Sequence, residues 1–379
     1  MPAEPADRLS PTVEYTCSPD WLLPKPDFGL DCSPMLKQNL MGLTRPQLEQ
    51  LMLSLGAKAF HGRQLYKWLY NTRQYDFELM TDLKKDLRAV LADRYDIRGL
   101  EVAHRQVSID GTEKFLFRLD DGQPVESVLI PDDNRGSRTV CISSQAGCAL
   151  ACRFCATGTM GLLRDLTVGE IVGQLVYLRE SQGEDCFSHV VFMGMGEPLN
   201  NYANLLESLR IMTDTLGLGL GAKKITVSTS GVTPKIRRLA DTGLKVKLAL
   251  SLHAATQDKR EQLMPIAKTF ALDKLMDAVR YYAETVGSRV TFEYILFDGF
   301  NDTMDDVLAL SKLIRGIPCK INILAYNPVP GLPYRRPSDE KVDWFGRQLY
   351  PRAPAVTVRK SRGLDIDAAC GQLAGRMKR

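Results

Sequence analysis

Three cysteines stand close together near the middle of the 379-residue chain. Cys148, Cys152 and Cys155 are separated by three and then two residues, within the stretch Gly147–Cys155. Thiolates at this spacing on one short loop can wrap a compact metal centre. A closed structural zinc site needs four ligands, usually in separated pairs, and no fourth ligand stands nearby. The spacing favours a four-iron cluster held by three thiolates, whose open iron can bind another molecule.

Glycines and small polar residues further along the chain could line a ligand site. The stretch MGMGEP, residues 193–198, contains Gly196, which lets backbone approach a ligand, and Glu197, whose carboxylate can pair with an ammonium group. Such residues are the expected lining for a ribose, an amino-acid head group and an adenine. The other candidates for this lining are Ser228, Ser251, Leu252, His253 and Asn327.

Alternating strands and helices would hold these residues in one place. The predicted strands cover residues 138–143, 189–194, 223–229, 245–251, 289–297 and 319–325. The predicted helices cover residues 167–182, 201–215, 234–242, 271–286 and 303–315. This alternation implies a parallel sheet with helices outside, either doubly wound or a partial barrel. In both folds the ligand site lies at the carboxyl ends of the strands, where the candidate residues stand.

The segments around this core differ in composition. We expect residues 1–36, rich in proline and acidic, to form a flexible tail. Residues 37–100 predict a helical domain with a helix start at Thr44, because Pro46 and Gln47 complete a capping pattern. Residues 101–133 predict a β-hairpin linker turning at Asp110-Gly111, followed by a strand that carries Glu126. The core would then span residues 134–365, and a C-terminal segment, 366–379, would carry Cys370.

Composition and charge exclude several classes of protein. Apolar residues make up 44% and charged residues 25% of the chain, as in globular domains. No stretch is long and apolar enough for a membrane span, and no secretory signal is visible. Nine cysteines, an odd number, argue against a secreted disulfide scaffold and for a cytoplasmic protein. The net charge is +4, and residues 37–379 carry +8, which suits a polyanionic partner.

Several motifs in order resemble one subfamily of the radical S-adenosylmethionine (SAM) enzymes. They are SRTVCISSQAGCALACRFCATG (137–158), GMGEPLN (194–200), SLHA (251–254) and VTVRKSRGLDIDAACGQL (356–373). The subfamily is the dual-specificity methyltransferase acting at C2 of adenine in 23S rRNA and tRNA. The resemblance implies an α/β fold, a partial (β/α)6 TIM-like barrel with a [4Fe-4S] cluster on Cys148, Cys152 and Cys155. It also implies two SAM molecules per turnover and an external electron donor such as flavodoxin with its reductase, for a monomeric enzyme.

The family mechanism assigns roles to three more residues. A first SAM would methylate Cys370, and a radical made from a second SAM would take a hydrogen from that methyl group. The methylene radical would add to C2 and link the RNA to the protein. Glu126 would then remove the C2 proton, and Cys141 would form a transient disulfide with Cys370, releasing the base. The targets would be an adenosine of the peptidyl-transferase centre and the adenosine 3′ of the anticodon.

Two other functions are compatible with the same motifs. One is the paralogous enzyme that methylates C8 of the same ribosomal adenine and confers antibiotic resistance. The other is a non-catalytic RNA-binding protein with a structural iron–sulfur cluster. Basic side chains could bind the phosphates of an RNA and so make its binding salt-dependent. The candidates are Arg335, Arg336, Arg359, Lys360 and Arg362.

Overall fold

A ten-stranded sheet dominates the part of the chain that the computed structural model describes, residues 37–132 and 136–375. All of these except Lys37 belong to one unit, and the expected acidic tail, 1–36, lies outside the described residues. From one edge to the other the strands are β14 (Val356–Arg359), β13 (Cys319–Ala325), β12 (Val290–Leu296), β11 (Lys247–Ser251), β10 (Ile225–Thr229), β9 (His189–Phe192), β6 (Ser137–Cys141), β5 (Pro124–Asp132), β4 (Glu113–Arg118) and β3 (Glu101–Val107).

The strands from β14 to β6 run parallel, and β5, β4 and β3 continue the sheet antiparallel. All six predicted core strands are present, within two residues at each end. The prediction of an α/β partial barrel is confirmed, with β14 as an additional parallel strand. The predicted hairpin strands belong to the same sheet, because β5 pairs with β6. Glu126 on β5 and Cys141 on β6 therefore lie on neighbouring strands.

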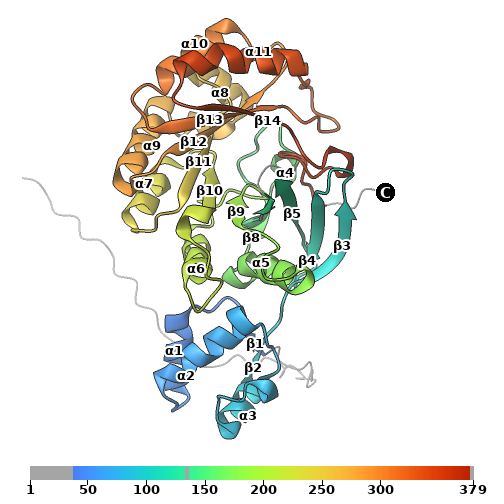
Figure 1. The fold of residues 1–379 in the computed structure, drawn as a ribbon, viewed down its shortest axis with the longest axis vertical. Helices are drawn as coiled ribbons and strands as arrows, with labels where there is room; N and C mark the ends of the chain where they lie inside the picture. The colour runs from blue at the N-terminus through green and yellow to red at the C-terminus, as the bar shows by residue number, and fades with distance from the viewer. Residues whose placement is uncertain (1–36, 133–135, 376–379) are drawn as a thin grey trace, which may run out of the picture. The chain divides into compact units, whose positions relative to one another are not determined.

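Helices cover the outer side of the parallel strands. In Figure 1, α6, α7 and α9 lie on one side of β9–β12, and the short α4 lies on the other. Threonine caps start two of the helices, since Thr167 bonds the backbone of Glu170 and Thr303 that of Asp306. The helix that follows β13 was not predicted. The outer helices are α5 (Val168–Gln182), α6 (Tyr202–Thr213), α7 (Thr233–Asp241), α9 (Leu272–Val286), α10 (Met304–Leu313) and α11 (Asp339–Leu349).

Short elements lie in the loops between the main strands and helices. The strands β7 (Gln145–Gly147) and β8 (Leu162–Asp165) pair antiparallel around α4 (Ala156–Thr159). The other short elements are α8 (Gln257–Leu263) and the 3-10 turns η3 (Ala222–Lys224), η4 (Pro265–Lys268), η5 (Tyr350–Arg352) and η6 (Leu364–Ile366). Among the described residues, no helix combines the length and apolar character needed to cross a bilayer.

A small helical part precedes the sheet. The predicted helix start is confirmed, because Thr44 and Gln47 form a reciprocal capping box. Gly62 lets the first two helices touch, since a Cβ there would lie 2.4 Å from the backbone nitrogen of Glu49. An ion pair from Arg45 to Asp214 joins this part to the chain after α6. Its elements are β1 (Gln38–Asn39), α1 (Arg45–Ser54), α2 (Ala59–Lys67), the π-helical turn η1 (Trp68–Thr72), η2 (Phe77–Leu79), α3 (Lys85–Arg94) and β2 (Tyr95–Asp96).

Candidate active site

The cysteine loop lies between β7 and α4, beyond the carboxyl end of β6. Its first residue is fixed by a close backbone approach between β7 and β8. Gly147 has a φ of +75°, and a Cβ there would lie 2.0 Å from the carbonyl oxygen of Gly161. Only glycine fits at this crossing, because any side chain would clash with backbone. The glycine before Cys148 thus sets the position from which the three cysteines follow.

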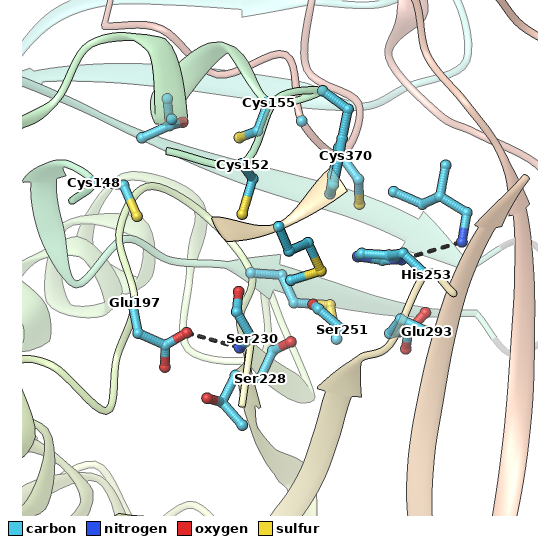
Figure 2. A pocket seen from close by; sticks show the side chains of 18 of the residues that line it. Cys148, Cys152, Cys155, Glu197, Ser228, Ser230, Ser251, His253, Glu293 and Cys370 are labelled. Atoms are coloured by element: carbon cyan, nitrogen blue, oxygen red, sulfur yellow. Dashed lines mark hydrogen bonds between the residues drawn. The ribbon is translucent and has the colours of Figure 1, made fainter. Parts of the chain in front are cut away.

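Cys148, Cys152 and Cys155 line one cavity, hereafter the main cavity, at the carboxyl ends of the parallel strands. Figure 2 shows their thiols on the same part of its wall. The empty volume, which includes solvent space at the opening, is about 900 Å³. Burial raises the pKa of each thiol, that of Cys148 to about 12. A bound metal centre would have to favour the thiolates against this burial.

The arrangement of these thiols fits a cluster better than a single ion. Among the described residues no three His, Cys, Asp or Glu side chains are grouped tightly enough to hold one metal ion. A tetrahedral zinc would hold its sulfur ligands about 3.8 Å apart, given its bond length to sulfur. In a four-iron cluster each thiolate binds a different iron, so the sulfurs stand further apart. Three thiols that line one cavity without being grouped for a single ion are compatible with such a cluster.

Glu197 lies at the opposite wall of the main cavity, after β9 (Figure 2). Its Oε2 accepts a hydrogen bond from the backbone nitrogen of Ser230 at 2.8 Å, and its Oε1 accepts one from Leu199 at 3.1 Å. Burial raises the pKa of this carboxyl above its usual value. Gly196, with a φ of +100°, lets the chain pass Gln145, whose Cβ would lie 2.6 Å from an added Cβ. The side chains of Thr229 and Ser230 also hydrogen-bond this carboxylate, and each of these bonds favours its charged form and lowers its pKa.

Three of the residues predicted to contact a ligand line the main cavity, namely Ser228, Ser251 and His253. The Nδ1 of His253 accepts a hydrogen bond from the backbone nitrogen of Ile295 at 3.2 Å. Burial lowers the pKa of His253 to about 3, so the ring is neutral and carries its proton on Nε2. His253 therefore offers a hydrogen-bond donor. Leu252 does not line the main cavity, because its side chain is fully buried behind it.

Cys370 reaches the main cavity from the C-terminal segment, far from the other cysteines in sequence. The side-chain amide of Asn327 donates to the carbonyl oxygen of Cys370 at 3.2 Å, and the backbone nitrogen of Ala156 donates to that of Gly371 at 2.8 Å. The residue is exposed to solvent, yet many protein atoms surround its sulfur. This burial raises the pKa of the thiol, and the charge of Arg359 acts in the opposite direction.

Cys141 and Cys370 share a second cavity. Cys141, at the end of β6, is buried, and both cysteines line this space together with Asn327 and Arg359. Burial is the main cause that raises the pKa of Cys141, and the neighbouring Cys370 adds to it. The structure therefore brings the two cysteines together although 229 positions separate them. Asn327 lines this second cavity and not the main one.

Glu126 lies in a third cavity, on the other side of the C-terminal segment, and does not line the main cavity. Its Oε1 pairs with the Nζ of Lys114 at 3.2 Å, and both side chains are buried. Its Oε2 accepts hydrogen bonds from the backbone nitrogens of Ala374 and Gly375, at 2.8 and 2.9 Å. The carboxylate thus holds the end of the described C-terminal segment.

The candidate phosphate-binding residues fall into two groups. Arg359, Lys360 and Arg362 line the second cavity beside Cys370. Arg335 pairs with Asp298, and Arg336 donates to the side-chain oxygen of Asn327. The first group therefore places positive charge beside the Cys370 thiol.

Sequence reasoning missed other residues of the site. Glu293 lines the main cavity and accepts a hydrogen bond from the amide of Asn322 at 2.8 Å, and burial raises its pKa. A carboxylate inside the apolar run VTFEYIL was a signal for it, because such residues are seldom buried without a role. Lys114 and Arg260 gave no comparable signal, since each is one basic residue among many.

The fold and the three-cysteine site define the class: this is a radical SAM protein. The family model described as "Radical SAM superfamily" matches residues 142–311. The family model described as "Ribosomal RNA large subunit methyltransferase N-terminal domain" matches residues 38–97. A radical SAM methyltransferase from Sphaerobacter thermophilus superposes with a TM-score of 0.83 and 43% identity. That match covers 89% of this chain and all of the Sphaerobacter chain.

Curated relatives narrow the class to one family. The dual-specificity RNA methyltransferase RlmN of Alcanivorax borkumensis is 44% identical over 351 residues, 90% of this chain and 91% of its own. That of Anaeromyxobacter sp. is 45% identical over 348 residues, 90% of this chain and 92% of its own. The chain belongs to the RlmN family.

Proposed function

We propose that this protein methylates C2 of adenosine in 23S rRNA and in tRNA through a methyl group carried by Cys370. One observation carries the proposal: Cys370 faces the three cysteines in the main cavity and also shares the second cavity with Cys141. An S-methyl group at this position would stand between the source of a radical and a thiol that can release the product. The names of the relatives support RNA as the substrate.

The main cavity supplies binding groups for the two cofactors. Cys148, Cys152 and Cys155 would hold a [4Fe-4S] cluster, which when bound supplies the electron that cleaves SAM to a 5′-deoxyadenosyl radical. Glu197, whose carboxylate lines the main cavity, would pair with the ammonium group of SAM. An external donor such as flavodoxin would supply that electron to the cluster. The ribose and adenine would be held by the polar side chains that line the same cavity, Ser228, Ser251 and His253.

Cys370 would carry the methyl group because adenine C2 cannot take it directly from SAM. This carbon is electron-poor and does not attack the methyl group of SAM, whereas a thiolate does. The C-terminal segment holds the thiol at the wall of the main cavity through Asn327 and Ala156. Arg359 lies in the same cavity, and its charge favours the thiolate. The first SAM would therefore methylate Cys370, and a second would supply the radical.

Glu126 and Cys141 would complete the reaction. The adduct that forms when the methylene carbon joins C2 would carry one unpaired electron, and that electron would pass back to the cluster. A base must also take the C2 proton, and Glu126 is our candidate. Cys141 would then attack the sulfur of Cys370, so that an S–S bond forms and the S–C bond breaks. The electron pair of the broken bond passes to the carbon, which takes up a proton and becomes the methyl group. The shared second cavity supports this step.

Nucleoside analysis tests the proposal. The chain is expressed in bacterial cells without an RlmN enzyme of their own, and digested rRNA and tRNA are analysed by mass spectrometry against 2-methyl- and 8-methyladenosine standards. We expect 2-methyladenosine from the native chain and from Cys186→Ala, a control at a buried thiol outside the three cavities. Cys370→Ala should yield none. An 8-methyl product, or normal methylation by Cys370→Ala, would contradict the proposal.

A further inference from the structure

Arg260 is a buried cation without a carboxylate partner. It lies on α8 with 1% of its surface exposed, and among the described residues it forms no ion pair. Its Nη2 donates to the carbonyl oxygens of Ser230, at 2.5 Å, and Ser251, at 3.4 Å. Its Nε is buried and has no hydrogen-bond partner. Among the described residues, the hydrogen bonds of this guanidinium go to two carbonyl groups just after β10 and at the end of β11.

Such a charge is costly unless an anion balances it. A buried ion loses its hydration, and dipoles alone recover only part of that free energy. An arginine guanidinium keeps its proton in proteins, so Arg260 stays charged although it is buried. The fold therefore keeps a positive charge at this place, and the balancing negative charge must come from a nearby group.

The helix that carries Arg260 is attached to the cysteine loop. The backbone nitrogen of Arg153 donates to the carbonyl oxygen of Leu263, the last residue of α8, at 2.9 Å. Cys152 is the residue next to Arg153, and Arg260 is the residue one helical turn before Leu263. Cys152 is also the group that favours the charged form of Arg260, against the effect of burial. Arg260 and Cys152 therefore face each other across this junction.

The same side chain fixes the wall of the main cavity. Ser230 offers its carbonyl oxygen to Arg260 and its backbone nitrogen to Glu197. Gly231 makes room for the guanidinium, because a Cβ there would lie 3.2 Å from its Nη2. Arg260 thus does not line the main cavity. It is connected to Glu197 through Ser230 and to the cysteine loop through the hydrogen bond between Arg153 and Leu263.

We propose that Arg260 is a positioning residue whose charge balances the Cys152 side of the bound cluster and so favours its reduced form. The inference rests on the proposed function only in requiring the cluster. Reduction adds one negative charge to the cluster, and a fixed cation close by stabilises that state more than the oxidised one. Removing the charge should lower the reduction potential, while the hydrogen bonds to Ser230 and Ser251 keep the wall in place.

The test separates charge from hydrogen bonding. Arg260→Lys keeps the charge and places its donors on a single nitrogen, and Arg260→Gln keeps donors without the charge. Arg179→Met is the control, because Arg179 is also a buried arginine, at 8% exposed, but pairs with Glu184 and does not line the main cavity. Each variant is reconstituted without oxygen, its iron content and circular dichroism are checked, and the cluster is titrated with reductant under electron paramagnetic resonance, without SAM.

We expect Arg260→Gln to shift the ratio of reduced to oxidised cluster at least tenfold toward the oxidised form. For a one-electron couple this is about 59 mV. Arg260→Lys and the control should stay near the native value. Equal shifts in Arg260→Lys and Arg260→Gln would overturn the proposal, because hydrogen bonding would then be the cause.

Two other outcomes are also decisive. If Arg260→Gln keeps the native potential but binds SAM at least tenfold more weakly, the charge serves the SAM carboxylate and the proposal is wrong. If Arg260→Gln folds but holds no cluster while Arg260→Lys holds one at the native potential, the charge requirement is supported. Failure of the native chain to hold a cluster would contradict the proposed function instead.

Discussion

The ion pair between Lys114 and Glu126 gives a stability prediction that does not depend on catalysis. Both side chains are almost completely buried, at 5% and 1% exposed, and the charged atoms are 3.2 Å apart. Removing one partner of such a pair leaves a buried charge, which costs about 3–5 kcal/mol. Two backbone nitrogens still donate to Glu126. We therefore expect Lys114→Met to lower the free energy of unfolding by about 3 kcal/mol, the lower end of that range.

The assay is urea unfolding followed by far-ultraviolet circular dichroism. Arg118→Met is a matched control on the same strand, since Arg118 forms an exposed pair with Glu101 at 3.8 Å. An exposed pair should contribute less than about 1 kcal/mol. The double variant Lys114→Met/Glu126→Gln should recover part of the lost stability, because no buried charge remains.

The reasoning fails if Lys114→Met and Arg118→Met destabilise the protein equally. It also fails if neutralising Glu126 in the Lys114→Met background brings a further loss. The first result would mean that Lys114 is solvated in the folded protein. The second would mean that the hydrogen bonds to Ala374 and Gly375 need the charged carboxylate more than the cation does.

Two further predictions concern pH and packing. The pKa of His253 is about 3 in the folded chain and 6.5 as the ordinary value, so its contribution to stability is complete above pH 6.5 and falls as the pH decreases. Urea unfolding should show a loss of about 2 kcal/mol from pH 7 to pH 5 that is smaller in His253→Gln. Gly62→Ala should cost more than about 2 kcal/mol, since its Cβ meets backbone. Gly99→Ala, where the space is open, should remain near native in the same assay, and equal losses would contradict the packing argument.

Local patterns in the sequence predicted the parts of the site that depend on neighbouring residues. The cysteine spacing, the capping box at Thr44 and the six core strands each rest on residues a few positions apart. Strand β14 was missed because VTVR is short and largely exposed, so it carries little apolar pattern. The helix α11 follows a proline-rich stretch, and it was not expected there.

Contacts between distant residues were beyond the reach of sequence patterns. Nothing near Glu126 indicates that its carboxylate binds backbone 248 positions later. Arg260 lies in the polar run QDKREQL, which reads as an exposed helix, although its side chain is fully enclosed. Leu252 stands between two cavity residues just after β11, but its side chain is fully buried and does not line the main cavity.

The double anchoring of the C-terminal segment bears on the timing of the proposed reaction. Ser108 and Asp110, at the turn after β3, bind Asp365 and the backbone of Gly363, and Glu126 binds the backbone of Ala374 and Gly375. Cys370 lies between these two points of attachment. If Glu126 accepts a proton from the substrate, its hydrogen bonds to the backbone of Ala374 and Gly375 must first break. An incoming nucleotide would then have to release the carboxylate of Glu126 in the same movement that brings its own C2 to the sulfur of Cys370.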